Sequence, residues 1–514
     1  MKKRTLLLGI CLICISVITL SAGGGQQSGS GGKSEISIPI FDRGAIPAVE
    51  GTYEDNRWTR WINENSPVNV RWIPVPRWET TTTYNTMFAA GTAPDVVVEY
   101  NKWFMDMYYA QGVIQEVGSL VENYSVHYKQ YLQNHPELLP YITADDGKMY
   151  GISSSRTLDS IINHGMNIRK DWLDRFGMQI PTTTDEVLIF ARRVRDEDPD
   201  GNGLHDTFAF SGDGALFTSF QRMFGQPNWG HPIVNGRMVD WTTTQGYIDY
   251  LNFRTLLHRE GHIDPEYVVD TNYVRARQLL ATGKVGIYVN GWAIPPDQWR
   301  ELMTNIPTAE YIYLPPWRTS QGQFALHWEA PSNYMALINY QSRNGREVMQ
   351  FCDWLISDNF WTLTQGFEGR HYTLINGRPQ VIDVELNRIE RAYVGDYAFL
   401  RGDFGWTPEW MIPPDPSIID PLELRLALFR RDMLTEAMKV NRFCAIPYAP
   451  TGEFIENFQV EINAQVGAIE TNIFLGRISV DEGLRQINAY KNSMGWPRYQ
   501  QEIDAWYQAN RNLF

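Results

Sequence analysis

The first hundred residues alternate between stretches typical of strands and of helices, and this order constrains the fold more than any other feature. Residues 34–41 alternate polar and apolar side chains, as a half-buried strand does, and a Trp-bearing helical stretch follows at 57–64. Residues 68–73 predict a second strand and 84–90 a second helix. A turn and an apolar strand of the buried, parallel kind follow at 91–100. This alternation predicts an α/β fold with a parallel sheet.

Length and charge limit the class of protein further. The chain has 514 residues, enough for two or three domains, and its 43% hydrophobic and 13% aromatic content is that of a packed globular protein. The net charge of −14 argues against nucleic acid and anionic membrane as partners, because both require clustered Lys and Arg. We therefore expect no nucleic-acid partner.

The N-terminus predicts export. Residues 1–23 combine a basic start, an apolar core and small residues behind it, which is the pattern of a signal peptide. Residues 24–33 form a Gly, Ser and Gln linker. Leu20-Ser-Ala-Gly resembles the front of a bacterial lipobox, but Gly24 stands where the lipidated cysteine belongs. The sequence therefore predicts a water-soluble exported protein, in the periplasm or at the outer face of the cytoplasmic membrane, and gives no support to a lipid anchor.

Two cysteines remain after the predicted signal peptide, Cys352 and Cys444. An exported pair can form a disulfide, but both lie in apolar stretches that equally suit buried thiols. We favour thiols. No Cys/His cluster has the spacing of a zinc site.

Oxygen-bearing side chains stand at positions 198, 200, 202 and 206, close to the every-second-position spacing that a loop wrapping a hard cation requires. Gly203 supplies the sharp bend of an EF-hand-like loop, but position 12 is Ala209 instead of a bidentate glutamate. The predicted ligands of a structural calcium ion are Asp198, Asp200, Asn202, the Leu204 carbonyl and Asp206. The alternative is a plain turn between a helix and a strand.

A resemblance to family 1 extracellular solute-binding proteins of ABC importers rests on several motifs. Residues 87–97, MFAAGTAPDVV, resemble the family's "aaG-x-x-PD" signature. Further segments similar to family motifs follow in family order: 108–112, 117–120, 132–138 (LQNHPEL), 146–152 (DGKMYGI), 168–177 with 181–186, 282–292 (TGKVGIYVNGW) and 365–372 (QGFEGRHY). Residues 198–206 resemble the calcium loop of alginate-oligosaccharide-binding members, in which another acid follows the last Asp. Thr207 stands there in this chain.

This resemblance implies an α/β, two-lobed periplasmic-binding-protein fold. Each lobe would be a mostly parallel sheet flanked by helices, with extra helices at the C-terminus. Carried over to this chain, lobe one would comprise residues 34–151 and 322–372. Lobe two would comprise 152–321 and 373–514. The ligand would bind between the lobes.

Open α/β sheets bind ligands in the loops beyond the carboxyl ends of their strands. This rule and the resemblance together select the candidate ligand contacts. Trp292 follows a strand and a glycine, at the position that matches the family's ligand-stacking tryptophan. The remaining candidates lie at predicted strand ends, at expected crossings between the lobes or in the irregular segment 406–417: Arg43, Trp103, Arg156, Trp328, Glu329, Tyr372 and Trp406. Salt bridges and packing between lobes or loops are the alternative roles for these residues.

The resulting hypothesis is a monomeric, non-enzymatic protein that binds a saccharide and delivers it to ABC permease subunits. A neutral oligosaccharide is favoured over a polyanion because the net charge is negative. The alternative from another class is a secreted, calcium-stabilised glycosidase or polysaccharide lyase, and a glycosidase requires two carboxylates facing each other across a cleft. A third alternative is a receptor-sensing adaptor that uses the same cleft without a transporter.

Overall fold

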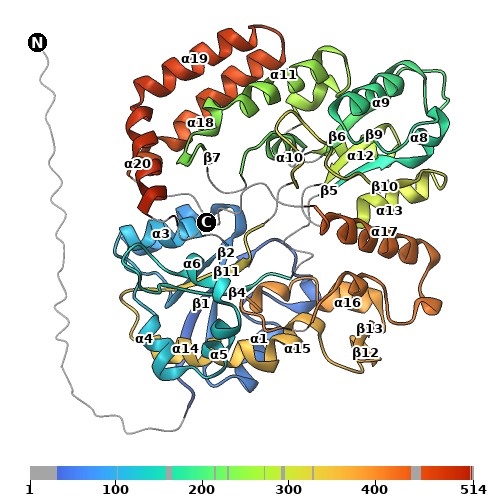
Figure 1. Ribbon diagram of the computed structural model, residues 1–514. Helices are drawn as coiled ribbons and strands as arrows, with labels where there is room; N and C mark the ends of the chain where they lie inside the picture. The colour runs from blue at the N-terminus through green and yellow to red at the C-terminus, as the bar shows by residue number, and fades with distance from the viewer. Residues whose placement is uncertain are drawn as a thin grey trace, which may run out of the picture.

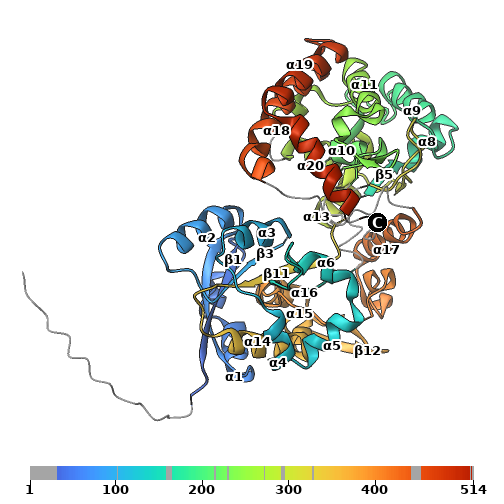
Figure 2. The same ribbon diagram turned by 60° about the vertical axis from the view of Figure 1, so that its left-hand side comes forward.

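The computed structural model describes residues 32–100, 102–157, 165–212, 216–227, 231–270, 273–290, 296–326, 329–403, 405–440, 453–509 and 511. The predicted signal peptide lies outside these residues. The described chain forms two lobes, one above the other in Figure 1 and separated more clearly in Figure 2. The chain passes between the lobes three times: between β4 and β5, between β10 and β11, and between residue 400 and α17.

Lobe one is the lower lobe in Figure 1. Its strands are β1 (Glu35–Asp42), β2 (Asn69–Pro76), β3 (Val96–Glu99), β4 (Gly151–Ser155), β11 (Ser332–Ile338), β12 (Tyr372–Ile375) and β13 (Arg378–Val381). Its helices are α1 (Arg57–Asn65), α2 (Thr80–Ala89), α3 (Lys102–Ala110), α4 (Gly118–Tyr124), α5 (His127–Asn134), α6 (Leu139–Ile142), α14 (Gly345–Trp354), α15 (Phe360–Gln365) and α16 (Val384–Glu390).

Lobe two is the upper lobe. Its strands are β5 (Gly165–Arg169), β6 (Phe208–Gly212), β7 (Ile233–Val234), β8 (Arg237–Met238), β9 (Val285–Asn290) and β10 (Tyr311–Tyr313). Its helices are α8 (Lys170–Phe176), α9 (Thr184–Asp196), α10 (Leu216–Met223), α11 (Gln245–Arg259), α12 (Val274–Ala281), α13 (Pro296–Asn305), α17 (Pro421–Ala437), α18 (Glu453–Phe474), α19 (Val480–Ser493) and α20 (Trp496–Ala509).

The sheets are mixed and not mostly parallel as predicted. In lobe one β1 pairs with β2 in parallel, while β11 is antiparallel to both β3 and β4. In lobe two β6 and β9 are parallel, and β5 is antiparallel to β9. The antiparallel strands β5 and β11 each follow a passage from the other lobe. Such a strand enters its sheet from the junction between the lobes, which reverses its direction relative to the others.

The same directions place the carboxyl ends of the other strands at the junction. Gly165, at the start of β5, pairs with Asn290 at the end of β9, and Gly212 at the end of β6 pairs with Val289. In lobe one the beginning of β11 pairs with the ends of β3 and β4. Each lobe therefore presents the carboxyl edge of its sheet to the other lobe, which is where open α/β sheets bind ligands.

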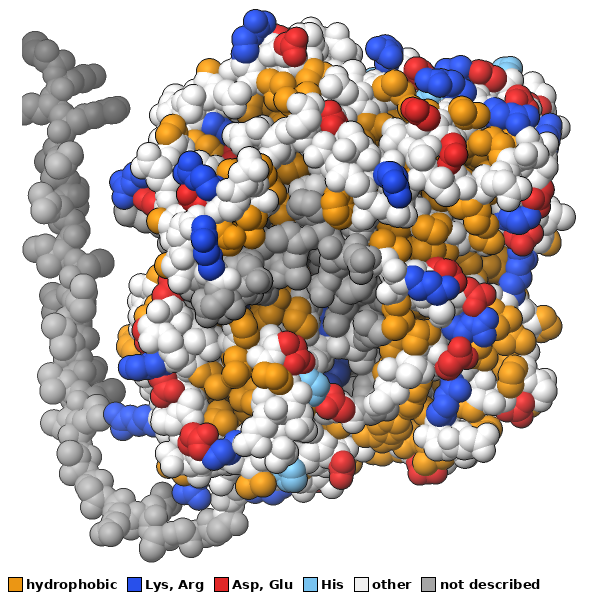
Figure 3. All heavy atoms as spheres, viewed as in Figure 1, with side chains coloured by type: hydrophobic (Ala, Val, Ile, Leu, Met, Phe, Trp, Pro, Cys, Tyr) orange, Lys and Arg blue, Asp and Glu red, His pale blue; other side chains and the backbone are white. Residues whose placement is uncertain are grey.

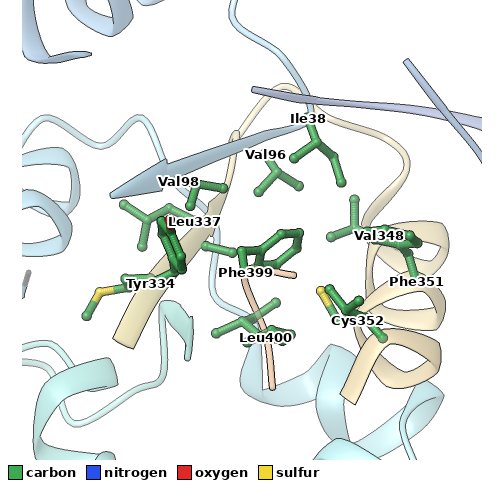
Figure 4. Close-up of a cluster of buried hydrophobic side chains, with 14 of the residues drawn as sticks. Ile38, Val96, Val98, Tyr334, Leu337, Val348, Phe351, Cys352, Phe399 and Leu400 are labelled. Carbon is green, nitrogen blue, oxygen red and sulfur yellow. The ribbon is translucent and has the colours of Figure 1, made fainter. Parts of the chain in front are cut away.

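The apolar core of lobe one extends further along the chain than predicted. Phe399 and Leu400 lie among Ile38, Val96 and Leu337 in a single buried cluster (Figure 4). The predicted boundary at residue 372 is therefore wrong, because the apolar run 393–400 completes this core. The predicted crossings also shift: 152–155 belong to β4 of lobe one, and Leu326 packs in the lobe-two core.

Lobe two has its own core, to which the C-terminal helices contribute. Ile469 and Ile473 of α18 and Ile487 of α19 are buried with Tyr250 and Leu251 of α11. A buried ion pair joins these helices to the rest of the lobe, with Lys491 Nζ 2.6 Å from Asp240 Oδ2 and side chains 7% and 5% exposed. The predicted C-terminal helices are confirmed by α18 and α19.

Local sequence signals set the end of α8 and the start of α9. Gly177 ends α8 with a φ of 63°, a left-handed conformation that glycine adopts without strain. Thr183 caps α9 by accepting from the Glu186 N–H at 3.3 Å. The Glu186 carboxylate accepts from the Thr182 N–H at 2.7 Å, so the reciprocal bond of a capping box is shifted by one residue from Thr183.

Cys352 is buried in lobe one, and burial raises the pKa of its thiol. Cys444 lies outside the described residues. The disulfide state of the pair stays a prediction.

Candidate functional site

The carboxyl edge of lobe one gathers arginine, carboxylate and aromatic side chains from distant parts of the sequence. β1, β2, β3 and β4 end at this edge and β11 begins there, so residues directly after or before these strands become neighbours. We call this set the lobe-one edge: Phe41, Arg43, Arg77, Trp78, Glu99, Tyr100, Arg156, Glu329, Tyr334 and Asp396.

Arg43 is fixed in a closed hydrogen-bond network. Its Nε donates to Asp396 Oδ2 at 2.7 Å and its Nη2 to the Tyr100 hydroxyl at 3.0 Å. The Tyr100 hydroxyl donates to that of Tyr334 at 2.5 Å, and the Tyr334 hydroxyl donates to Asp396. Each partner comes from a different element, so the network holds the sheet edge and the 393–400 segment in one arrangement.

Arg77 lies among aromatic rings. Its guanidinium carbon is 4.7 Å from the ring centre of Phe41, 4.9 Å from that of Tyr100 and 5.1 Å from that of Trp78, within the range of cation–π attraction. Its Nη1 donates to Glu99 Oε1 at 3.2 Å. Trp78 is 87% exposed, which is unusual for so large an apolar ring and presents a flat face to solvent.

Glu99 is a buried acid at the end of β3. Burial raises its pKa to about 7, and the charge of Arg77 opposes this shift. Glu99 Oε2 and Arg77 Nε are buried and have no hydrogen-bond partner among the described residues. Buried polar atoms are nearly always hydrogen-bonded, so a ligand or bound water would satisfy groups left open at this edge.

Arg156 and Glu329 form a third pair of opposite charges. Arg156 Nη1 lies 3.7 Å from Glu329 Oε2, and its Nε donates to the Ser332 carbonyl at 2.9 Å. The Arg156 guanidinium carbon is 5.6 Å from the ring centre of Tyr100, which connects this pair to the Arg43 network. Burial lowers the pKa of Arg156, and the Glu329 charge opposes that effect.

The structure brings some of the predicted contacts together and separates others. Arg43, Arg156 and Glu329 meet at the lobe-one edge. Trp103, in the first turn of α3 beyond β3, is 38% exposed. Trp292 and Trp328 lie outside the described residues.

Two predicted contacts lie elsewhere. Tyr372 is 5% exposed in the β12–β13 hairpin, and its hydroxyl accepts from Trp361 Nε1 at 3.0 Å. Trp406 is partly buried against the apolar cluster of α13 and α17, so it helps to dock its own segment. The structure therefore places neither residue at the lobe-one edge.

Sequence reasoning missed seven residues of this edge. Phe41, Glu99 and Tyr100 lie at the ends of predicted strands, and Arg77 and Trp78 come shortly after one, so the rule that selected Arg43 also indicates these five. Tyr334 and Asp396 had no such signal, because their roles depend on the return of the chain to lobe one after residue 326.

Lobe two presents a buried amide at its own carboxyl edge. Asn290 ends β9 and is fully buried, and neither its Oδ1 nor its Nδ2 has a hydrogen-bond partner among the described residues. Asn167 of β5 has the same burial and the same two open atoms. Asn290 lies at the end of β9 beside the junction, while Asn167 lies in the middle of β5.

The acidic residues of the predicted cation loop surround a lysine. Lys284 Nζ lies 2.5 Å from Asp200 Oδ2 and 2.9 Å from Asp206 Oδ1. Asn202 Nδ2 donates to the same two carboxylates, at 3.2 and 3.1 Å, and Asn202 Oδ1 accepts from the Leu204 N–H at 2.7 Å. An ammonium group therefore lies where a bound cation would contact these oxygens.

The loop fits a hard cation only in part. Asp198 Oδ1 and Asp200 Oδ1 are buried without a hydrogen-bond partner among the described residues, and calcium prefers such carboxylate oxygens. The Thr207 hydroxyl, by contrast, donates to the Val194 carbonyl. In the described part of the chain, no three His, Cys, Asp or Glu side chains form a group that could hold a metal ion.

Comparison with known proteins extends these observations. The family model described as "Bacterial extracellular solute-binding protein" matches residues 49–359. The lipoprotein LipO of Bacillus subtilis (strain 168) is 23% identical over 535 aligned positions, covering 99% of this chain and 99% of that protein. The polygalacturonan/rhamnogalacturonan-binding protein YtcQ of the same strain is 29% identical over 302 positions, covering 56% and 57%.

Solved structures show the same fold. The S. pneumoniae ABC-transporter substrate binding protein FusA, in complex with kestose, superimposes with a TM-score of 0.71 at 17% identity. The match covers 94% of this chain and 100% of that one, so it includes both lobes. The predicted fold class is confirmed, with the sheets corrected to mixed.

Proposed function

The chain belongs to the bacterial extracellular solute-binding protein family, and we propose that it captures an uncharged oligosaccharide between its lobes for an ABC importer. The observation that supports this most directly is the lobe-one edge, where aromatic rings and arginine–carboxylate pairs lie side by side at the junction with lobe two. Permease subunits are the partners to which such a protein would deliver its ligand.

The composition of the edge suits a sugar ring. A sugar presents flat C–H faces, which pack on aromatic rings, and hydroxyl groups, which pair with planar groups that donate or accept. Trp78 offers an exposed ring, and Arg77 beneath it restricts its position. Asn290 would supply the opposing contacts from lobe two.

The charges at the edge favour an uncharged ligand. Arg43 pairs with Asp396, Arg77 with Glu99 and Arg156 with Glu329, so three cations meet three acids. A uronate would have to compete with these acids for each arginine, whereas a hydroxyl can bridge an arginine and its carboxylate without separating them. YtcQ, as its name states, binds polygalacturonan and rhamnogalacturonan, so this chain would differ from that relative in its ligand.

The same pairs argue against hydrolysis. A glycosidase needs one carboxylic acid and one carboxylate exposed on opposite sides of the bond. Glu99 has the raised pKa of a general acid, but it is only 6% exposed and its carboxylate bonds to Arg77. We infer that this carboxyl group orders the site and does not transfer a proton to a ligand.

Export follows from the family, whose members are extracellular. No helix in the described part of the chain is long and apolar enough to cross a membrane. We propose that the protein acts as a monomer, because one chain supplies both lobes.

Lys284 competes with calcium for the carboxylates of the 198–206 loop. We propose that calcium binds the 198–206 loop only when the Lys284 ammonium leaves Asp200 and Asp206, so the lysine sets the affinity of the site. Bound calcium would fix the turn between α9 and β6 and take no part in chemistry.

Two measurements test the binding function. Incubation with uncharged oligosaccharides followed by chromatography should return them intact, and conversion to shorter sugars would favour the glycosidase instead. Small-angle scattering should show a smaller radius of gyration with ligand, because contacts from both lobes favour the closed state. An unchanged radius at saturation would contradict capture between the lobes.

A further inference from the structure

Lobe two contains a cavity of about 290 Å³ beside the carboxyl end of β6. Ser211 and Gly212 of that strand form one wall, and the others come from α10, α11, α12, α18 and the turn 265–268. These elements adjoin in the upper lobe of Figure 1. Ligand pockets range from about 300 to 1,000 Å³, so this cavity suits one small molecule and not a chain of several sugar rings.

The cavity combines aromatic faces with a fixed guanidinium. Phe217 and Tyr267 line it, with ring centres 5.2 Å apart. The guanidinium carbon of Arg254 is 3.6 Å from the ring centres of both Phe217 and Phe474, so the side chain is sandwiched. Arg254 Nη1 donates to the Tyr250 hydroxyl, while its buried Nε has no hydrogen-bond partner among the described residues.

The other charged groups of the lining cancel. Arg275 Nε donates to Asp264 Oδ2 at 2.7 Å, and Asp270 accepts from the Arg275 and Ala276 N–H groups at the start of α12. Two arginines and two aspartates therefore face the cavity with no net charge. An anionic ligand would gain little here, and an apolar one would cover these polar groups without replacing their contacts with water.

Tyr273 at the cavity has a strained backbone. Its φ is 57° and ψ is 22°, a left-handed conformation that bulky residues rarely adopt, and it is 39% exposed. Such strain is retained in structures chiefly at binding and catalytic sites. The conformation places a tyrosine where glycine would fit without strain.

From these observations we propose that the cavity binds one residue of an uncharged saccharide, entirely within lobe two. The aromatic faces would take the C–H side of the ring, and the Arg254 Nε and the Arg275–Asp264 pair would take its hydroxyl groups. This inference rests on the proposed function, because it identifies where one sugar of the captured ligand would bind before the lobes close.

Binding of free monosaccharides tests whether the cavity accepts one sugar ring. Saturation-transfer NMR with millimolar D-glucose, D-galactose, D-fructose and D-galacturonate should show transfer to at least one uncharged sugar and not to the uronate. Ala276→Leu places a larger side chain in the cavity from α12 and should abolish the signal. Gln278→Leu, at an exposed position of the same helix, is the matched control and should retain it.

Tyr273→Gly separates binding from folding. Glycine relieves the left-handed strain, so the melting temperature should stay equal or rise, while the affinity for the monosaccharide should fall at least tenfold. The proposal is overturned by the absence of any monosaccharide signal, by binding of the uronate alone, or by a signal that survives Ala276→Leu.

Failure of this inference can be distinguished from failure of the proposed function. Lobe closure by oligosaccharides without any monosaccharide signal would overturn the cavity proposal alone. A monosaccharide signal in the cavity with no closure by any oligosaccharide would overturn capture between the lobes and leave the cavity proposal in place.

Discussion

Replacing Lys284 with methionine should make the stability of lobe two depend on calcium. Methionine keeps the length of the side chain but removes the ammonium that bonds to Asp200 and Asp206. Without that ammonium, two carboxylates of one loop would remain close together with no cation between them. We expect the variant to be less stable than the wild-type protein in chelator and to recover when calcium is added.

The size of the effect follows from the contacts and their exposure. The Lys284 and Asp200 side chains are 18% and 17% exposed, while Asp206 is 42% exposed and more screened by water. Hydrogen bonds to charged groups contribute about 1.5–3 kcal/mol, and the exposed bond adds less, so about 2–3 kcal/mol should be lost. In a lobe of this size that corresponds to a melting temperature roughly 5–10 °C lower.

Calcium affinity should change in the opposite direction. In the wild-type protein calcium must displace the ammonium, and this displacement costs about the same 2–3 kcal/mol. Each 1.4 kcal/mol is a tenfold change in affinity, so Lys284→Met should bind calcium about 30- to 150-fold more tightly. Calcium at about a hundred times its dissociation constant would return about 2.7 kcal/mol of stability to the variant.

Calorimetry in chelator and in calcium measures both effects. Lys170→Met is the matched control, because it removes a Lys–Asp pair of α8 whose side chains are 37% and 59% exposed. Exposed pairs contribute about 0–1 kcal/mol, so this control should change neither stability nor calcium affinity appreciably. Equal melting temperatures of Lys284→Met and the wild-type protein in chelator, together with equal calcium affinities, would refute the reasoning.

Three further predictions concern the lobes. Trp78→Ala should weaken saccharide affinity by at least about 1 kcal/mol, or fivefold, while the melting temperature stays unchanged because the ring is exposed; an unchanged affinity in calorimetric titration would exclude stacking on this ring. Lys491→Met should lower the free energy of unfolding in urea by about 3–5 kcal/mol, because Asp240 is left buried without its ion-pair partner. Adding Asp240→Asn should restore part of this free energy, and a loss below about 1 kcal/mol in Lys491→Met would contradict the role of the pair. The pKa of Glu99 is about 7 in the folded protein against an ordinary 4.5, so the unfolded chain releases this proton at lower pH. The free energy of unfolding should therefore fall by up to about 3 kcal/mol as the pH rises from 4.5 to 7. Glu99→Gln should flatten this pH dependence, and equal slopes for the variant and the wild-type protein would contradict the prediction.

Local signals allowed much of the fold to be predicted from sequence. The α1, α2 and β3 segments, the glycine stop of α8 and the Thr183 cap of α9 depend on neighbouring residues, so the sequence pattern contains them. The direction of β5 and β11 does not depend on neighbours. It depends on how the chain returns from the other lobe, and for this reason the sheets were predicted as mostly parallel.

Some residues of the candidate site could likewise be predicted from local sequence, and others could not. Arg43 and Arg156 follow strands, so their place at the edge could be predicted, and Glu329 lies at an expected return. Tyr372 also lies at a strand, but its hairpin packs within lobe one, and nothing in the local sequence separates a hairpin strand from a strand of the main sheet. Asp396 is 353 residues from Arg43 and becomes its partner only through the core formed by 393–400.

The ion pairs at the lobe-one edge explain how an acidic protein can use arginines to bind an uncharged ligand. On the face drawn in Figure 3, Lys and Arg side chains alternate with Asp and Glu and form no single basic area. Arg43 and Arg156 likewise keep acidic partners, so their charges are compensated before any ligand arrives. The paired carboxylate side chains also hold each guanidinium in one orientation, which lowers the entropy lost when a hydroxyl of the ligand pairs with it. Selectivity for an uncharged sugar over a uronate would therefore come from arginines whose charge is already balanced by a carboxylate, and not from a lack of positive charge at the site.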